Sequence, residues 1–170
     1  MKPICIQATM LSLTVGAVSA GLTFLLFATP ALALDQREAE AVVTIMEALA
    51  EEMGEGMSTD AARIFYDYDS LSGSLIPAAG FDRASWIVAY DAVASGYMAT
   101  IPQDEFDAIF EEPLAMLEAS GLPEDQKVAM RAHVDGLIAE AQQVRLEGMQ
   151  HADVVRPLEN RLYPLFHGEY

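Results

Sequence analysis

The chain has 170 residues, with 9 Lys and Arg against 26 Asp and Glu, and its formal net charge is −17. This excess of acid repels polyanions, so we expect the protein to bind neither nucleic acid nor anionic membrane surfaces. The hydrophobic content of 52% is raised by one apolar stretch near the start, and it therefore does not indicate a membrane protein.

Residues 1–33 have the features of a secretory signal peptide. Lys2 is their only charged side chain, an apolar run follows it, and Ala31-Leu32-Ala33 provides a small-x-small cleavage site. Cleavage there would leave residues 34–170 as a single helical domain of 137 residues, with eight basic and 26 acidic side chains. The apolar run is also about long enough to cross a bilayer, so an uncleaved signal anchor is the alternative.

The single cysteine, Cys5, precedes the apolar run and would leave with the signal. The mature chain would then have no thiol and no disulfide. An export segment without cysteines is typical of the bacterial envelope, since small eukaryotic secreted domains usually depend on disulfides. We therefore expect a periplasmic or secreted protein that has no stable membrane association after cleavage.

After the signal, apolar residues recur at helical spacing, and no stretch alternates as a half-buried strand does. The first helix is expected over 35–53, before Gly54, and the second over about 61–69. Residues 70–80 include two Gly, three Ser and a Pro, and they predict a loop. The third helix follows Asp82, and its apolar seam has the four-three spacing of a buried stripe: Trp86, Tyr90, Val93, Tyr97 and Ile101.

Two further helices and a terminal segment are expected beyond Pro102. The fourth helix begins near Gln103, and Pro113 predicts a kink or break near Glu111. The fifth and longest helix covers about 123–146, and a short or bent segment with two prolines closes the chain. A second seam of four-three spacing lies on the fifth helix: Met130, Val134, Leu137, Ala141 and Val144. The sequence thus predicts an all-α bundle of about five helices, whose coiled-coil-like core is set by the third and fifth helices.

The pattern of histidines does not support a metal centre or a bound cofactor. Bundle metal sites typically carry a Glu three residues before a His, whereas Met130, Gly148 and Pro164 occupy those positions here. Thioethers with an imidazole suit Cu(I), which makes Met149 and His151 the available pair, with Met46, Met53 and Met57 as further thioethers. Methionine is also an ordinary core residue, so a copper or divalent-cation module is only an alternative.

Covalent catalysis lacks its usual sequence signals. The chain has no Gly-x-Ser-x-Gly elbow, and no serine lies three residues before Lys127. A carboxylate-dependent hydrolase of cell-envelope glycan stays open as a second alternative, because it needs only an acid whose pKa is raised by burial. Asp91 and Asp135 are the nearest such residues, since each follows a seam residue.

Seven of the twelve aromatic residues that follow the signal lie between Phe65 and Tyr97, and the segment from Tyr66 to Trp86 combines aromatics with aspartates and Arg83. Consecutive aromatics cannot all face one core, so a rim of phenols and carboxylates beside the loop could hold a cationic or amphipathic ligand. The alternative is that these residues close one end of the bundle, with an aspartate capping a turn. The residues that we predict for a ligand or partner site are Tyr66, Asp67, Asp69, Asp82, Arg83 and Trp86.

The sequence as a whole predicts an exported, acidic helical protein with a non-catalytic role. We expect it to bind a partner protein or a small cationic or amphipathic ligand, without a cofactor. The acidic side chains also keep such a protein soluble, which requires no partner.

Overall fold

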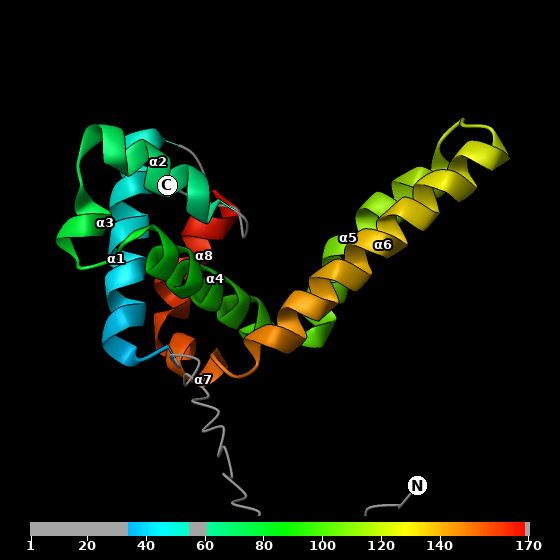
Figure 1. The fold of residues 1–170 in the computed structure, drawn as a ribbon. Helices are drawn as coiled ribbons and strands as arrows, with labels where there is room; N and C mark the ends of the chain where they lie inside the picture. Colours follow the sequence, from blue (N-terminus) through cyan, green and yellow to red (C-terminus); the bar gives the residue numbers. More distant parts are fainter. Residues whose placement is uncertain (1–33, 55–60, 169–170) are drawn as a thin grey trace, which may run out of the picture. The chain divides into compact units, whose positions relative to one another are not determined.

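The computed structural model describes residues 34–54 and 61–168, and within them every regular element is a helix (Figure 1). The predicted signal peptide, Met57 and the residues just before the second helix lie outside the described residues. The all-α prediction is confirmed. The helices are α1 (Gln36–Met53), α2 (Ala62–Ser72), α3 (Leu75–Ala78), α4 (Arg83–Thr100), α5 (Gln103–Ala119), α6 (Glu124–Gly148), α7 (Ala152–Val155), the 3-10 helix η1 (Arg156–Leu158) and α8 (Glu159–His167).

Local signals set the ends of α1 and α4. The Asp35 carboxylate accepts a 2.8 Å hydrogen bond from the backbone N–H of Glu38, and Gly54 ends α1 in the left-handed region with φ of 66°. At α4, the Asp82 carboxylate accepts from the Ser85 N–H at 2.8 Å, and the Ser85 hydroxyl accepts from the Asp82 N–H at 2.9 Å. This reciprocal capping box satisfies two backbone donors and starts the helix.

The hydrophobic core lies among α1, α2, α4 and the C-terminal helices. On α4, Trp86, Tyr90, Val93 and Tyr97 are buried as their spacing predicts. The Trp86 ring lies 5.6 Å from Tyr90, and its indole N–H donates to the carbonyl of Ala62 at 2.8 Å. Residues from α1 and from the end of the chain complete this core: Ala39, Val42, Val43, Met46, Leu49, Val155, Leu158, Leu162 and Leu165.

Two predictions about secondary structure are wrong: the loop at 70–80 and the number of helices. Residues 70–80 are not one loop, because α2 continues to Ser72 and α3 occupies Leu75–Ala78. The Asp69 carboxylate explains this: it accepts from the backbone N–H groups of Leu75 and Ile76 at 2.8 and 2.9 Å and so organises the first turn of α3. The described helices also exceed the predicted five, because the prolines near the C-terminus divide that segment into α7, η1 and α8.

The helix around Pro113 does not break. Helix α5 runs from Gln103 through Pro113 to Ala119. Proline removes one backbone donor and crowds the carbonyl four residues earlier. Both Pro113 and Ile109 are exposed, so water can satisfy that carbonyl and the helix continues. The predicted kink stays a prediction.

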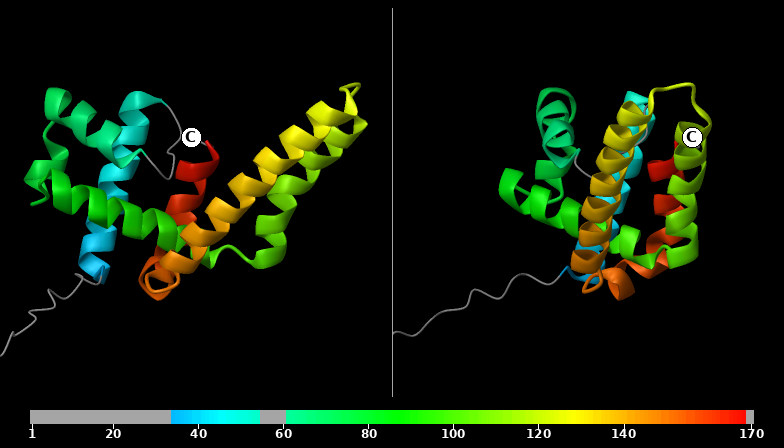
Figure 2. Two further views of the ribbon diagram at one scale, coloured as in Figure 1. Left: turned by 45° about the vertical axis from the view of Figure 1, so that its right-hand side comes forward. Right: turned by 90° about the vertical axis from the view of Figure 1, so that its right-hand side faces the viewer.

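Helices α5 and α6 form an antiparallel hairpin, and they lie side by side in both views of Figure 2. None of their residues belongs to the core described above. The predicted role of the α6 seam in that core is therefore wrong: Met130 is 50% exposed and Leu137 is 46% exposed. Their spacing encodes an apolar face, but this face is not covered by the core helices.

Candidate functional site

The residues predicted from the Tyr66–Trp86 segment divide into two groups in the structure. Asp69 and Trp86 are fully buried, and both make hydrogen bonds to the backbone. Asp82 caps α4, and its pKa is lowered by the hydrogen bonds from the backbone and side chain of Ser85. These three side chains are engaged in holding the local fold.

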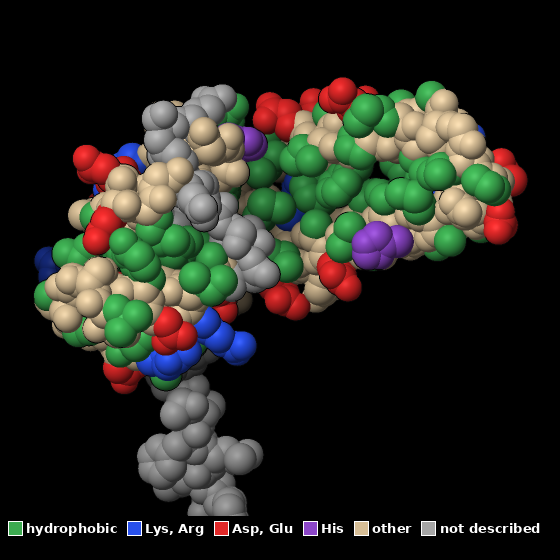
Figure 3. All heavy atoms as spheres, turned by 90° about the horizontal axis from the view of Figure 1, so that it is seen from above, with side chains coloured by type: hydrophobic (Ala, Val, Ile, Leu, Met, Phe, Trp, Pro, Cys, Tyr) green, Lys and Arg blue, Asp and Glu red, His purple; other side chains and the backbone are tan. Residues whose placement is uncertain are grey.

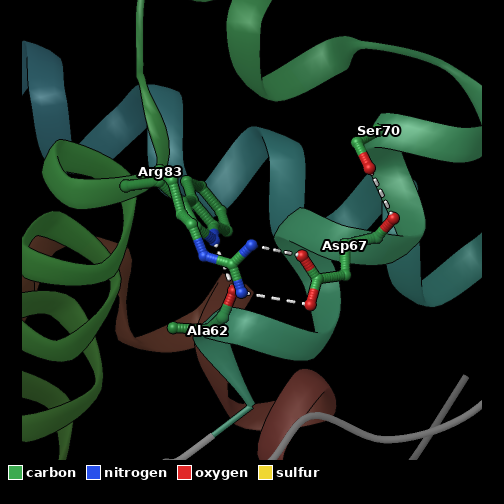
Figure 4. Close-up of polar contacts among 5 residues, drawn as sticks. Ala62, Asp67, Ser70 and Arg83 are labelled. Atoms are coloured by element: carbon green, nitrogen blue, oxygen red, sulfur yellow. Dashed lines mark hydrogen bonds and ion pairs between the residues drawn. The ribbon is translucent and has the colours of Figure 1, made fainter.

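The other three predicted residues meet at the surface. The Arg83 guanidinium donates to both carboxylate oxygens of Asp67, at 2.7 and 3.1 Å, and links α4 to α2 (Figure 4). It also lies 5.6 Å from the centre of the Tyr66 ring. Both charged side chains are about half exposed, so their pairing adds little stability. Each charge already has a partner within the chain. Their use in binding a ligand stays a prediction.

A hollow of about 540 Å³ lies where α2, α4 and α6 meet. Apolar side chains from all three helices line it together with charged ones, and sequence analysis gave no signal for it because its walls are far apart along the chain. The lining residues are Ala62, Arg63, Ile87, Asp91, Ala92, Ser95, Val144, Glu147 and Gln150. Its volume falls in the usual range of binding clefts, roughly 300–1,000 Å³.

Asp91 lines this hollow, and the pKa of its carboxyl group is raised above the ordinary value. Partial burial raises the pKa of the Asp91 carboxyl, and the nearby Arg63 guanidinium lowers it by a smaller amount. Asp91 and Asp135, the two acids suggested by the sequence, are both exposed residues, but Asp135 does not line the hollow. Of these two acids, Asp91 is the one at the hollow.

The hairpin has many apolar residues but buries few of them. Phe106 and Leu117 are its only buried hydrophobic side chains among the described residues. Ile109 and Met116 on α5 are 50% and 61% exposed, comparable to Met130 and Leu137 on α6. Single exposed hydrophobic side chains are common on protein surfaces. A series of them at regular intervals along two adjacent helices indicates a contact surface.

These exposed residues lie on one face of the hairpin. Ile109 and Met116 are seven residues apart on α5, and Met130, Leu137 and Val144 repeat the interval on α6, so each set forms one stripe. The opposite face is marked by the ion pair between Glu118 and Arg131. Successive residues of a helix are about 100° apart around its axis. This spacing places both stripes on one side of the α5–α6 contact and the ion pair on the other side.

We call these five residues (Ile109, Met116, Met130, Leu137 and Val144) the apolar strip. Figure 3 shows hydrophobic side chains gathered along the hairpin, with acidic side chains at the margins. Val144 belongs both to the strip and to the hollow at the base of the hairpin. The strip and the hollow are therefore one continuous surface.

The hairpin is fixed to the core helices by close backbone contact. A Cβ atom placed on Gly148 would lie 1.9 Å from the carbonyl oxygen of Ser95 and 2.9 Å from the backbone nitrogen of Gly96. Only glycine at position 148 allows α4 and α6 to approach this closely. Arg145 adds a 2.8 Å hydrogen bond to the carbonyl of Ile101 and lies 4.4 Å from the centre of the Phe106 ring.

The described residues give no support to a metal site. Within 34–54 and 61–168, no three His, Cys, Asp or Glu side chains cluster as ligands of one ion. Of the predicted thioethers, Met46 is fully buried in the core and Met149 is exposed. Partial burial lowers the pKa of His151. In the same ranges, no helix has the length and hydropathy needed to cross a bilayer.

Comparison of the chain with protein-family models, curated proteins and solved structures finds no match.

Proposed function

We propose that this chain is an exported, non-catalytic binding protein that holds a partner protein on the apolar strip of the α5–α6 hairpin. The observation that carries the proposal is the exposure of the strip, whose spacing is that of a packed helical seam. Four of its residues are about half exposed or more, although α1 and α4 bury residues of the same spacing. A partner would remove this apolar surface from water and gain binding free energy from its burial.

The hairpin supports this role better than the Tyr66–Arg83 surface does. The strip is apolar, continuous with the hollow and unused by the core. At the Tyr66–Arg83 surface, Asp67 and Arg83 neutralise each other. A ligand there would first have to separate the two charges.

Affinity isolation of the tagged, full-length chain from the cells that express it tests the proposal. The double variant Met130→Ser/Leu137→Ser removes apolar side chains from the strip. Val128→Ser/Leu146→Ser is the matched control, because these residues of α6 are 60% and 61% exposed and lie on the other flank of the helix. We expect a stoichiometric partner with the wild type and the control, and at least a tenfold loss with the strip variant.

Both double variants should keep the circular dichroism and the unfolding midpoint of the wild type within a few degrees, since neither changes the core. Equal recovery of the partner by the strip variant, or absence of any stoichiometric partner, would refute the proposal.

One observation favours a second function, hydrolysis of envelope glycan. Asp91 lines the hollow beside Glu147, and burial raises its pKa in the direction that suits a general acid. Release of reducing ends from purified cell-wall glycan by the wild type, with loss of that activity in Asp91→Asn, would support it. No release by the wild type would exclude it.

A further inference from the structure

The apolar strip has acidic margins on both sides. On α5, Glu105 and Glu112 are seven residues apart and lie next to the stripe of Ile109 and Met116. On α6, Glu140 and Glu147 repeat the interval beside Leu137 and Val144. All four glutamates are exposed. An occupant of the strip would therefore meet a row of carboxylates at each edge.

The basic side chains of the hairpin do not neutralise these margins. Lys127 donates to the carbonyl of Glu118 at 2.7 Å, and Arg131 pairs with the carboxylate of the same residue on the face opposite the strip. Arg145 is directed to Ile101 and Phe106 at the base. Residues 103–148 contain 11 acidic and three basic side chains, so the hairpin has a net charge of −8.

We infer that the partner presents an amphipathic α-helix whose apolar stripe is flanked by Lys or Arg, and that this helix lies along the strip between its glutamate margins. This inference rests on the proposed function. From Met130 to Val144 the strip extends about 21 Å, at about 1.5 Å per residue, which corresponds to roughly four turns of a bound helix. Apolar anchors at seven-residue intervals would contact the strip while the flanking cations meet the carboxylates.

Charge distinguishes this occupant from a second copy of the chain. Two hairpins packed through their strips would bring glutamate margins together, and each hairpin has a net charge of −8. Like charges at such an interface oppose association. A basic helix instead gains long-range attraction, which would speed its encounter with the hairpin and weaken as salt is added.

Binding of synthetic peptides to the protein purified from the cells that express it tests the inference. The probe is a fluorescent 18-residue helical peptide with a leucine stripe flanked by lysines. One control peptide replaces the lysines with glutamates, and a second has the same composition in scrambled order. Fluorescence anisotropy at low salt should show saturable binding of the probe, with the scrambled peptide at least tenfold weaker and the glutamate peptide unbound.

Variants of the protein locate the bound peptide. Met130→Ser/Leu137→Ser should weaken binding at least tenfold, whereas Val128→Ser/Leu146→Ser should leave it unchanged. Glu112→Gln/Glu140→Gln should weaken binding several-fold and reduce its dependence on salt. The inference is overturned if the scrambled peptide binds equally well, or if the strip variant binds as the wild type does.

Two further measurements distinguish other occupants. A dimer at micromolar concentration in sedimentation equilibrium, lost in the strip variant, would assign the strip to a second copy. Co-sedimentation with phosphatidylcholine vesicles would assign it to a lipid surface. Either result contradicts the basic helix. If affinity isolation finds a strip-dependent partner but the probe peptide does not bind, the proposed function stands and only the inferred chemistry of its partner fails.

Discussion

Helices α4 and α6 carry apolar residues at the same four-three intervals, yet the structure uses the two seams differently. On α4 the seam is covered by α1, α2 and the C-terminal helices, so Trp86 and Tyr90 have no exposed surface. On α6 the close contact with α4 lies at the C-terminal end, at Gly148, and Met130 and Leu137 are left half exposed. The first seam stabilises the fold, whereas the second leaves apolar surface available for binding. This comparison can be tested by changing equivalent residues in each region.

The largest difference is expected between two leucines. Leu162 is fully buried in the core, and Leu162→Ala should reduce the free energy of unfolding by about 2–5 kcal/mol. Leu137 is 46% exposed, so Leu137→Ala should cost less than about 1 kcal/mol. Urea unfolding followed by circular dichroism measures both. Equal losses would mean that the hairpin belongs to the stabilising core.

The junction between the two regions can be altered through its glycines. Gly148→Ala should destabilise the protein by about 1–3 kcal/mol, because the new methyl group would overlap the Ser95 carbonyl. Gly136→Ala is the matched control, since nothing lies within 4 Å of its added Cβ, and it should stabilise α6 by about 0.5–1 kcal/mol. Thermal unfolding of both variants gives the comparison. A Gly148→Ala protein as stable as the wild type would contradict the close contact.

The structure of the predicted ligand region can be tested with two aspartates. Asp69→Asn replaces one of the two carboxylate oxygens that accept from the backbone N–H groups of Leu75 and Ile76, and should cost about 1–3 kcal/mol. Asp67→Asn weakens only an exposed ion pair and should cost about 0–1 kcal/mol. Chemical denaturation measures both. The reverse order would show that the Asp67–Arg83 pair, and not the Asp69 cap, maintains this region.

The smallest effect is expected at Asp91. Because burial raises its pKa in the folded state, the folded protein binds the proton more tightly and the ionised carboxylate opposes folding. The penalty is complete above the raised pKa. It disappears as the pH falls below the ordinary value of about 4, where both states are protonated. Asp91→Asn should therefore raise the unfolding midpoint by about 1–3 °C at pH 7 and leave it unchanged near pH 3. A lower midpoint at pH 7 would instead indicate that the attraction of Arg63 dominates.

The sequence predicts the helices well because their signals are local. Gly54 is a recognisable helix end and Asp82 a recognisable cap, and the aromatic spacing of α4 is recognisable as a buried seam. The same reasoning fails for α6, because periodicity shows that a helix has an apolar face but not which element covers it. Residue contacts between distant segments decide that, and the approach of Gly148 to Ser95 leaves no pattern in either segment.

The candidate site was harder to predict than the fold. The Tyr66–Trp86 segment was selected for its composition, and the structure engages Asp69, Asp82 and Trp86 in caps and backbone hydrogen bonds. The hollow combines residues as distant as Ala62 and Gln150, so no local motif marks it. The α6 part of the strip was visible in the sequence as a seam, but this spacing is equally typical of a core. Its exposure is what distinguishes a binding surface.

Site-specific photo-crosslinking in the cells that express the protein tests the central claim most directly. A photoreactive amino acid at position 137 lies on the strip, and one at position 71 replaces Leu71, which is 91% exposed and lies outside the hairpin. We predict one discrete adduct with a different protein at position 137 and none at position 71. Equal adducts at both positions, or none at position 137, would contradict the assignment of the strip as the binding surface.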